Sequence, residues 1–576
     1  MESLTLARDL LVILFTAFVG GVIAKKMRLP LVVGYLLGGI IVASSLINFI
    51  NFGDTLKNIA EIGVALLLFT LGLDFNLHKI KDLGNVIIFG SLIQILLTIF
   101  LGVFIFPLFG MDFYSSFFLA AVFSLSSTAV VVKGLSEKGE LDTLHGEIAA
   151  GWLFMQDLYT LPMMIILPGV GQMVSHGDAL AGALVYFLKS IVLAFASFFL
   201  VIFIGKKIVP YIFEKIAELR SRELLLIASI SFCLLFSFVF NALGFSFAIG
   251  AFIAGVLIAS SSVSHGIFAE VRPLRDIFSV VFFVSLGLLM NPAFLMSSFL
   301  NILLLVLVVI ILKFLIAGLL TLLLGYHTKT ATLVGISLVS VGEFAFILAL
   351  TGVSSHLISN DTYMTILSVS FISLIISAPL LSKSSNIYYN FKKIISNNVP
   401  ALSEIITKFD RGFKLNSNDL SNHVVVLGYG RVGRYICRAL SMANIPYVVV
   451  DYNLHIIKGL KQLGVNVIYG DPSEIDVLSF AKVSEAKIII MAYSDRHMQK
   501  SVVANIFTLN PKAKILSRIH FEEDQKILRG LGVSVLIQPE FEAALSITNK
   551  LFKLYNVPAE DVEGKITRLK IEHGLG

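Results

Sequence analysis

Runs of about 20 predominantly apolar residues recur from the start of the chain to about residue 382. A helix rises about 1.5 Å per residue, so a run of this length crosses the hydrocarbon core of a bilayer. Hydrophobic residues make up 57% of the 576 residues and charged residues only 14%, whereas soluble domains carry roughly 25% charged residues. A soluble fold could not bury so much apolar surface. This part of the chain is therefore predicted to be a polytopic α-helical membrane domain.

Basic residues give an independent prediction of its topology. About 13 spans are expected, at 8–24, 30–47, 57–75, 84–107, 113–134, 146–168, 180–205, 223–240, 245–262, 273–290, 297–324, 329–352 and 361–382. Every second loop carries Lys and Arg, whereas the alternate loops carry almost none. By the positive-inside rule, the N-terminus lies outside the inner (plasma) membrane and the C-terminal part lies in the cytoplasm. These clusters also explain the net charge of +6 without nucleic acid as a partner.

The composition changes at about residue 421. Short β-branched runs then alternate with charged helical stretches, a pattern typical of a soluble α/β domain. We therefore expect four parts, namely a membrane domain at 1–382, a linker at 383–421, a nucleotide-binding domain at 422–540 and a C-terminal extension at 541–576.

Three ionisable residues lie deep inside predicted spans, where a charge is costly and is usually functional or paired. They are Asp157, Lys313 and Glu343. The Asp157 carboxylate can hold either a proton or a cation, and this competition is the minimum requirement for an antiporter. The alternative is a static ion pair with a lysine. Lys313 lies too deep to reach the interface and needs a partner, for which Glu343 is a candidate, unless Glu343 stabilises the ends of a broken helix.

Two clusters of hydroxyl residues and glycine fall in mid-span, at 124–128 and 337–343. Such clusters favour broken helices whose freed backbone groups line a site, as in transporters built from inverted repeats. The clusters lie in the fifth and the twelfth predicted spans, and this odd offset of seven gives them opposite orientations in the membrane. Close helix packing through small residues would explain either cluster alone.

The soluble domain opens with a nucleotide-binding pattern. The β-branched run at 423–427 leads directly into a glycine-rich turn and then a helix, which is the context in which GxGxxG predicts phosphate binding at a helix N-terminus. An acidic residue at the end of the second strand can accept hydrogen bonds from a ribose, which favours NAD(H) or an AMP-type nucleotide. The candidate ligand-binding residues are Gly428, Gly430, Arg431, Val432, Gly433, Asp451 and, after the third strand, Asp471.

Five motifs, in order, resemble those of the monovalent cation:proton antiporter-2 family and, within it, the Kef-type potassium-efflux antiporters. They lie at 60–74, 126–131, 156–157, 282–287 and 342–346. The resemblance covers nearly the whole chain. It implies an NhaA-like fold of inverted repeats with crossed broken helices, a homodimer, and elevator-type movement of the core.

The resemblance also implies roles for single residues. Asp157 would carry the cation and the proton, and Ser126, Ser127 and Thr128 would mark the crossing helix beside it. The neutral Gln156 leaves one carboxylate at the paired position, which suggests exchange of one cation per proton. Lys313 resembles a family lysine that braces the core, although the acidic partner of that lysine is missing here.

The C-terminal domain resembles the RCK module, also called the TrkA-N domain, so we expect a nucleotide that regulates transport and no enzymatic reaction. Arg518 matches a basic family position that suggests glutathione as a further regulatory ligand. A sodium/proton antiporter of the same fold and a nucleotide-gated potassium channel remain alternatives. The chain has no TVGYG-like filter. A membrane-bound NAD oxidoreductase would need a substrate domain that the sequence lacks.

Overall fold

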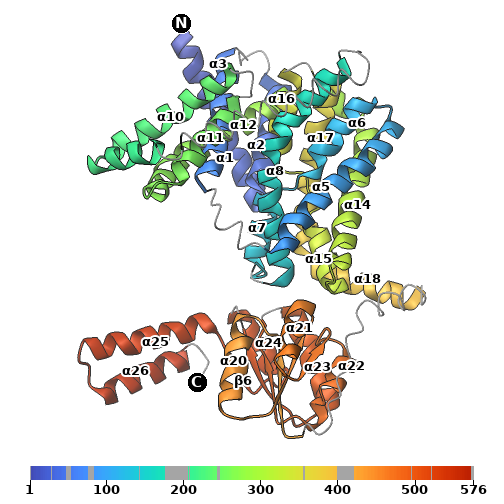
Figure 1. Cartoon of the computed structure of the whole chain (residues 1–576), viewed down its shortest axis with the longest axis vertical. Coiled ribbons are helices and arrows are strands. Elements are labelled where there is room, and N and C mark those ends of the chain that lie inside the picture. Colours follow the sequence, from blue (N-terminus) through green and yellow to red (C-terminus); the bar gives the residue numbers. More distant parts are fainter. Residues whose placement is uncertain are drawn as a thin grey trace. The chain divides into compact units, whose positions relative to one another are not determined.

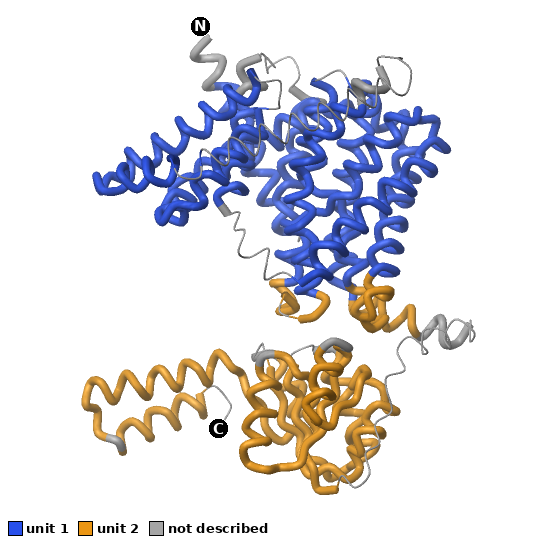
Figure 2. The backbone as a smooth tube through the Cα atoms, viewed as in Figure 1, with its two compact units in different colours: residues 1–135, 146–320, 334–384 blue, residues 136–145, 321–333, 385–576 orange. Residues whose placement is uncertain are grey.

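The protein is described here from a computed structural model, which covers residues 2–27, 29–46, 54–74, 84–141, 143–175, 205, 208–242, 247–354, 357–398, 421–493, 496–519 and 522–572. The predicted span at 180–205 and most of the predicted linker lie outside these ranges. Two compact units result (Figure 2). Unit 1 comprises residues 1–135, 146–320 and 334–384, and unit 2 comprises 136–145, 321–333 and 385–576.

Apolar helices make up unit 1 (Figure 1). The first half contains α1 (Glu2–Lys26), α2 (Leu31–Leu46), α3 (Asp54–Asp74), α5 (Asn85–Ile105), α6 (Phe113–Ser124), α7 (Thr128–Glu137) and α8 (Leu144–Ser175). The second half contains α10 (Arg222–Ala242), α11 (Phe247–Ala259), α12 (Ser264–Leu289), α13 (Pro292–Ser297), α14 (Phe299–Leu323), α15 (Thr328–Ser337), α16 (Phe344–Ser354) and α17 (Asn360–Ser382). Among the described residues, 6 helical segments are long and apolar enough to cross a membrane. The membrane class is confirmed, and the number of spans stays a prediction.

Two helical segments are interrupted where the hydroxyl clusters lie. The chain between α6 and α7 is extended at Leu125, and the chain between α15 and α16 leaves the helix from residue 338 to 343. The two interruptions meet, because the Gly342 amide donates a hydrogen bond of 3.2 Å to the Leu125 carbonyl. A Cβ at Gly342 would lie 2.5 Å from the backbone oxygen of Ser126, so only glycine permits this approach. We call this meeting point, residues 124–128 with 337–343, the crossover.

The soluble domain, in unit 2, is a six-stranded parallel sheet of order β3-β2-β1-β4-β5-β6. Its strands are β1 (Val424–Leu427), β2 (Tyr447–Asp451), β3 (Val467–Tyr469), β4 (Ile488–Met491), β5 (Lys514–Arg518) and β6 (Val535–Ile537). Its helices are α20 (Arg431–Met442), α21 (Leu454–Gln462), α22 (Ile475–Phe480), α23 (Arg496–Leu509) and α24 (Glu522–Gly530). Unit 2 also holds α18 (Ser384–Asn398) and the C-terminal α25 (Pro539–Leu554) and α26 (Ala559–Glu572).

Both faces of this sheet are covered. Alternate residues of β1 belong to two separate hydrophobic clusters, with Val425 in the cluster that includes α22, α23 and α24, and Val426 in the one that includes α20 and α21. The strand order reverses between β1 and β4, which is where doubly wound sheets bind ligands at their carboxyl ends. The predicted Rossmann-like domain is therefore confirmed.

A short polar cluster lies in the loop between α7 and α8. The Glu140 carboxylate forms an ion pair of 2.7 Å with Lys138 Nζ and lies 3.2 Å from His145 Nε2. Burial opposes ionisation of Glu140, but His145 and Lys138 outweigh it and hold the pKa of Glu140 below its usual value.

Glu140→Gln is expected to lower the unfolding temperature at neutral pH, since a hydrogen bond to a charged group contributes about 1.5–3 kcal/mol. A lowered folded-state pKa stabilises the fold above the unfolded-state pKa, and this stabilisation is lost as pH falls through the folded-state value. The difference from wild type should therefore shrink in acid. Thermal unfolding in detergent at several pH values measures it, with Glu218→Gln, at an exposed ion pair, as control. A difference that is the same at every pH would contradict this account.

Gly342→Ala is expected to destabilise the membrane domain, because the added methyl group meets a backbone oxygen that cannot move aside. Overpacking of this kind costs about 1–3 kcal/mol. The matched control is Gly266→Ala in α12, where nothing lies within 4 Å of the added Cβ. Thermal unfolding should separate the two variants, and equal unfolding temperatures would show that the crossover tolerates a side chain.

Candidate functional site

Asp157 lies beside the crossover. It comes from α8 and is buried, with 8% of its surface exposed. Its Oδ2 accepts a hydrogen bond of 2.8 Å from Thr128 Oγ1, and Thr128 is the first residue of α7. The carboxylate therefore lies at a helix N-terminus, where free amide groups and the helix dipole favour a negative charge.

Glu343 occupies the equivalent place on the other interrupted segment. It immediately precedes α16, and its Oε2 accepts a hydrogen bond of 3.0 Å from Ser127 Oγ. Ser127 and Thr128 are neighbours in the chain, so adjacent hydroxyl groups bind the two carboxylates. Each half-helix that starts at the crossover thus has an acidic side chain at its N-terminus.

Lys313 is fully buried on α14 and contacts the opposite helix ends. Its Nζ donates hydrogen bonds of 2.7 Å to the carbonyl oxygens of Leu125 and Ser340, one from each interrupted segment. These carbonyls follow the C-termini of α6 and α15, where the helix dipole is negative. Lys313 is therefore compensated by carbonyl groups, and Glu343 is bound to Ser127 rather than to Lys313. Carbonyl groups at the ends of two helices therefore take the place of the acidic partner that the family lysine has and Lys313 lacks.

Gln156 and Ser126 complete the network. The Ser126 amide donates a hydrogen bond of 2.8 Å to Gln156 Oε1, and Ser126 Oγ donates one of 2.9 Å to the Leu338 carbonyl. The predicted membrane residues Gln156, Asp157, Ser126, Ser127, Thr128, Lys313 and Glu343 all meet at the crossover. Ser340, from the predicted cluster at 337–343, accepts a hydrogen bond of 3.2 Å from the Ser127 amide through its Oγ. Sequence reasoning missed Gln94 of α5, which contacts Gln156. A lone Gln in a span as apolar as α5 was the available signal.

The glycine-rich turn of the soluble domain joins β1 to α20. Gly428 has φ +96°, which favours glycine, and a Cβ on Gly433 would collide with the Gly428 carbonyl. Around Gly430 the space is open, with nothing within 4 Å of a hypothetical Cβ. Helix α20 therefore packs close to the strand end and presents its N-terminus beside free space, as phosphate binding requires. Of Arg431 and Val432, which begin α20, the Arg431 side chain lies outside the described part.

Asp451 ends β2 and holds the turn in place. Its carboxylate accepts hydrogen bonds of 2.7 Å from the amides of Tyr429 and Asn453. Burial raises the pKa of Asp451 against the effect of these hydrogen bonds. The side chain thus lies next to the glycine-rich turn, as predicted for a ribose-binding acid.

Asp471 and Arg518 have different surroundings. Asp471 is buried and accepts hydrogen bonds from the amide (2.8 Å) and hydroxyl (2.7 Å) of Ser473. Burial opposes its ionisation, yet the charges of Lys329 and His327 and these hydrogen bonds hold the pKa of Asp471 below its usual value. Arg518 ends β5, and its Nε is buried with no hydrogen-bond partner among the described residues.

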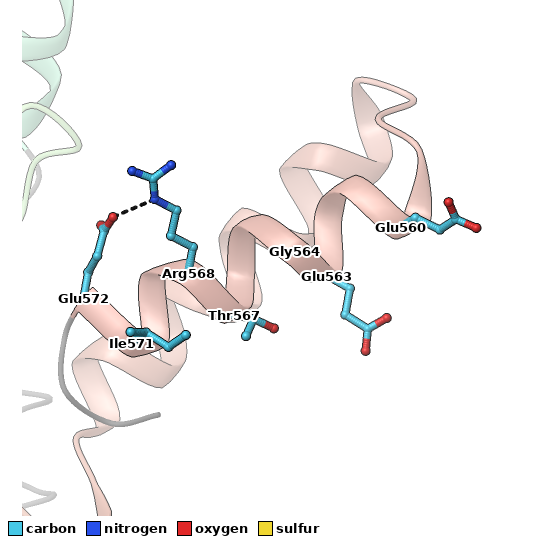
Figure 3. Close-up of a pocket in the computed structure, with 7 residues that line it drawn as sticks. All are labelled: Glu560, Glu563, Gly564, Thr567, Arg568, Ile571 and Glu572. Atoms are coloured by element: carbon cyan, nitrogen blue, oxygen red, sulfur yellow. Dashed lines mark hydrogen bonds and ion pairs between the residues drawn. The ribbon is translucent and has the colours of Figure 1, made fainter.

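A shallow pocket lies along α26 (Figure 3). Its lining residues come from this one helix, and an ion pair of 2.8 Å joins Arg568 to Glu572. Acidic side chains at Glu560 and Glu563 point outward from the same helix. Such a surface is typical of a solvated helix face, and it belongs neither to the crossover nor to the glycine-rich turn.

Comparisons with known proteins agree with this geometry. Residues 13–383 match the transmembrane sodium/hydrogen exchanger family, and residues 424–539 match the TrkA-N domain. The chain is 28% identical over 542 residues to the putative cation/proton antiporter YbaL of Escherichia coli (strain K12), covering 93% of this chain and 96% of that protein. It is 34% identical over 385 residues to K(+) efflux antiporter 6 of Arabidopsis thaliana, covering 66% of this chain and 63% of that protein.

A solved structure shows a similar fold. The sodium proton antiporter MjNhaP1 from Methanocaldococcus jannaschii has a TM-score of 0.50 and 16% identity, covering 67% of this chain and 98% of that chain. The first family match spans more than half of the chain. The chain therefore belongs to the sodium/hydrogen exchanger family of membrane proteins, as a Kef-type member with a C-terminal TrkA-N domain.

Proposed function

We propose that this protein exchanges potassium for protons across the inner membrane, with Asp157 as the carrier of both. The Thr128–Asp157 hydrogen bond at the start of α7 supports this role most directly, because it fixes one carboxylate in the crossover of a cation/proton exchanger fold. Proton and cation then compete for the same oxygens. The names of related potassium-efflux antiporters favour potassium, and sodium remains the alternative cation.

The stoichiometry follows from the charges at the crossover. Gln156 is neutral, and Lys313 is balanced by carbonyl groups. Glu343 accepts a hydrogen bond from Ser127 Oγ, and we assign it a structural role in this proposal. One carboxylate is then left to alternate between proton and cation, which gives exchange of one cation per proton.

We infer that the soluble domain regulates this exchange by binding NAD(H) or an AMP-type nucleotide in the cytoplasm. The open space at Gly430 and the Asp451 carboxylate beside the glycine-rich turn support a ribose and phosphate ligand there. A nucleotide bound more tightly in one transport state would shift the equilibrium between states. A homodimer, an extracellular N-terminus and control by glutathione at Arg518 remain part of the proposal.

Asp157→Asn is expected to abolish cation-driven proton flux, because an amide neither releases a proton nor attracts a cation. Proteoliposomes with an internal pH dye measure the flux after potassium, sodium or lithium salts are added. Asp361→Asn, at the exposed start of α17, is the matched control and should retain flux. Exchange by the Asp157 variant would contradict the carrier role, and a response to sodium alone would change the substrate while keeping the mechanism.

Gly430→Ala is expected to weaken nucleotide binding at least tenfold, about 1.4 kcal/mol, while the fold is retained. The methyl group enters open space in the protein but occupies the approach of a phosphate group. Calorimetric titration of the purified full-length protein with AMP and with NADH measures the affinity. Gly459→Ala in α21, which also meets nothing within 4 Å, is the control. Unchanged affinity for both nucleotides in the Gly430 variant would place the ligand elsewhere.

A further inference from the structure

Gln94 is a buried polar residue of the mainly apolar helix α5, in which Ser91 and Thr98 are also buried. It lies on the face of α5 that points into unit 1 and is 0% exposed, whereas Leu96 and Phe100 of the same helix are 55% and 59% exposed. A buried amide needs hydrogen-bond partners, since an unsatisfied one costs about 1–3 kcal/mol. The partners of Gln94 lie on α8, on α5 itself and at the crossover.

A chain of hydrogen bonds runs from one side of the α6–α7 break to the other. The Ser126 amide donates to Gln156 Oε1 (2.8 Å), and Gln156 Nε2 donates to Gln94 Oε1 (2.6 Å). Gln94 Nε2 then donates to the Ser124 carbonyl (3.3 Å) and to Thr98 Oγ1 (3.1 Å). Both ends of this chain are backbone groups, an N–H at Ser126 and a C=O at Ser124.

These backbone ends determine how both amides are oriented. Gln156 must present oxygen to the Ser126 N–H, so its NH₂ group faces Gln94. Gln94 must then present oxygen to Gln156 and its own NH₂ group to the Ser124 carbonyl. A carboxylate at either position would place two oxygens face to face, at the Gln94–Gln156 contact or at the Ser124 carbonyl.

We propose that Gln94 is a positioning residue that fixes the orientation of the Gln156 amide and thereby orients the neighbouring Asp157 toward Thr128. This inference rests on the proposed carrier role of Asp157. Gln156 directly precedes Asp157 on α8, so a hydrogen bond from Gln156 to α5 and to the break determines the rotation of α8 at the carrier. Gln94 hydrogen-bonds Gln156, Thr98 and the Ser124 carbonyl and acts on Asp157 only through Gln156.

Gln94→Glu provides the sharpest test, because its carboxyl group can mimic the amide in only one protonation state. A protonated acid accepts from Gln156 through its carbonyl oxygen and donates its O–H to the Ser124 carbonyl. The ionised form turns an oxygen without a proton toward that carbonyl. The ratio of Gln94→Glu flux to wild-type flux is therefore expected to be high in acid and to fall as the pH rises.

Gln156→Glu tests the same network from its other end. When the introduced carboxyl group is protonated, it accepts a hydrogen bond from the Ser126 amide and donates one to Gln94 Oε1. The flux of this variant, relative to wild type, is therefore also expected to fall as the pH rises. The charged groups around the pair are Asp157 on α8, Lys313 on α14 and Glu343 before α16, and all three are also present in the wild type. The ratio of variant to wild-type flux therefore reports the introduced carboxyl group.

Gln94→Leu removes the hydrogen bonds at every pH. We expect at least a tenfold higher KM for the cation with no new pH dependence, whereas Leu96→Ala on the exposed face of α5 should retain the wild-type KM. Proton flux in proteoliposomes measures all four variants, normalised to the folded protein after size-exclusion chromatography. If both Glu variants keep the wild-type pH profile, or if Gln94→Leu keeps the wild-type KM, the proposal is overturned. Failure of the carrier role is separate, since only exchange by Asp157→Asn would show it.

Discussion

The hydrogen bonds from Lys313 to the Leu125 and Ser340 carbonyls are the interaction on which the membrane domain depends. Irregular backbone at membrane depth is tolerated only when its polar groups have partners inside the protein. One ammonium group supplies donors to both interrupted segments at once. The two hydrogen bonds give one carbonyl group from each break a donor inside the protein, at the cost of burying the Lys313 side chain completely.

The rest of the crossover follows the same electrostatic rule. The positive group lies where carbonyl ends converge, and the two carboxylates lie where amide ends begin, at Thr128 and before α16. The Thr128 hydroxyl group and the start of α7 favour a negative charge on Asp157, whereas its burial and the nearby Glu343 carboxylate oppose one. A cation that binds Asp157 must then share the carboxylate with the Thr128 hydroxyl group and the helix dipole. Because the cation shares the carboxylate with the Thr128 hydroxyl group, it would bind less tightly and could leave again. A carrier must both bind and release its ion.

The sequence predicted the elements of the site better than their contacts. Hydroxyl and glycine clusters indicated both interruptions, because helix packing through small residues accounts poorly for two clusters placed symmetrically in mid-span. Asp157 was a rare carboxylate deep inside a span. The partners of Lys313 could not be predicted, because they are carbonyls that every residue possesses. The link between Gln94 and Gln156 joins residues 62 apart in the chain, so no local pattern reveals it. In the soluble domain, the glycine-rich turn could be predicted because its residues are contiguous.

The membrane domain and the soluble domain share one feature, a helix N-terminus at the proposed site, which is α7 in the first and α20 in the second. In each, a helix N-terminus with free amide groups faces an anion. At α7 the anionic group is the Asp157 carboxylate, which is part of the chain, so in the proposed function the mobile species is the cation or proton that neutralises it. At α20, apart from the chain neighbours, no described residue lies within 4 Å of a Cβ placed on Gly430, and the Asp451 carboxylate accepts a hydrogen bond from the Tyr429 amide. In the proposed function the anion at α20 is the phosphate group of a bound nucleotide, so similar helix-end chemistry would serve transport in one domain and ligand sensing in the other.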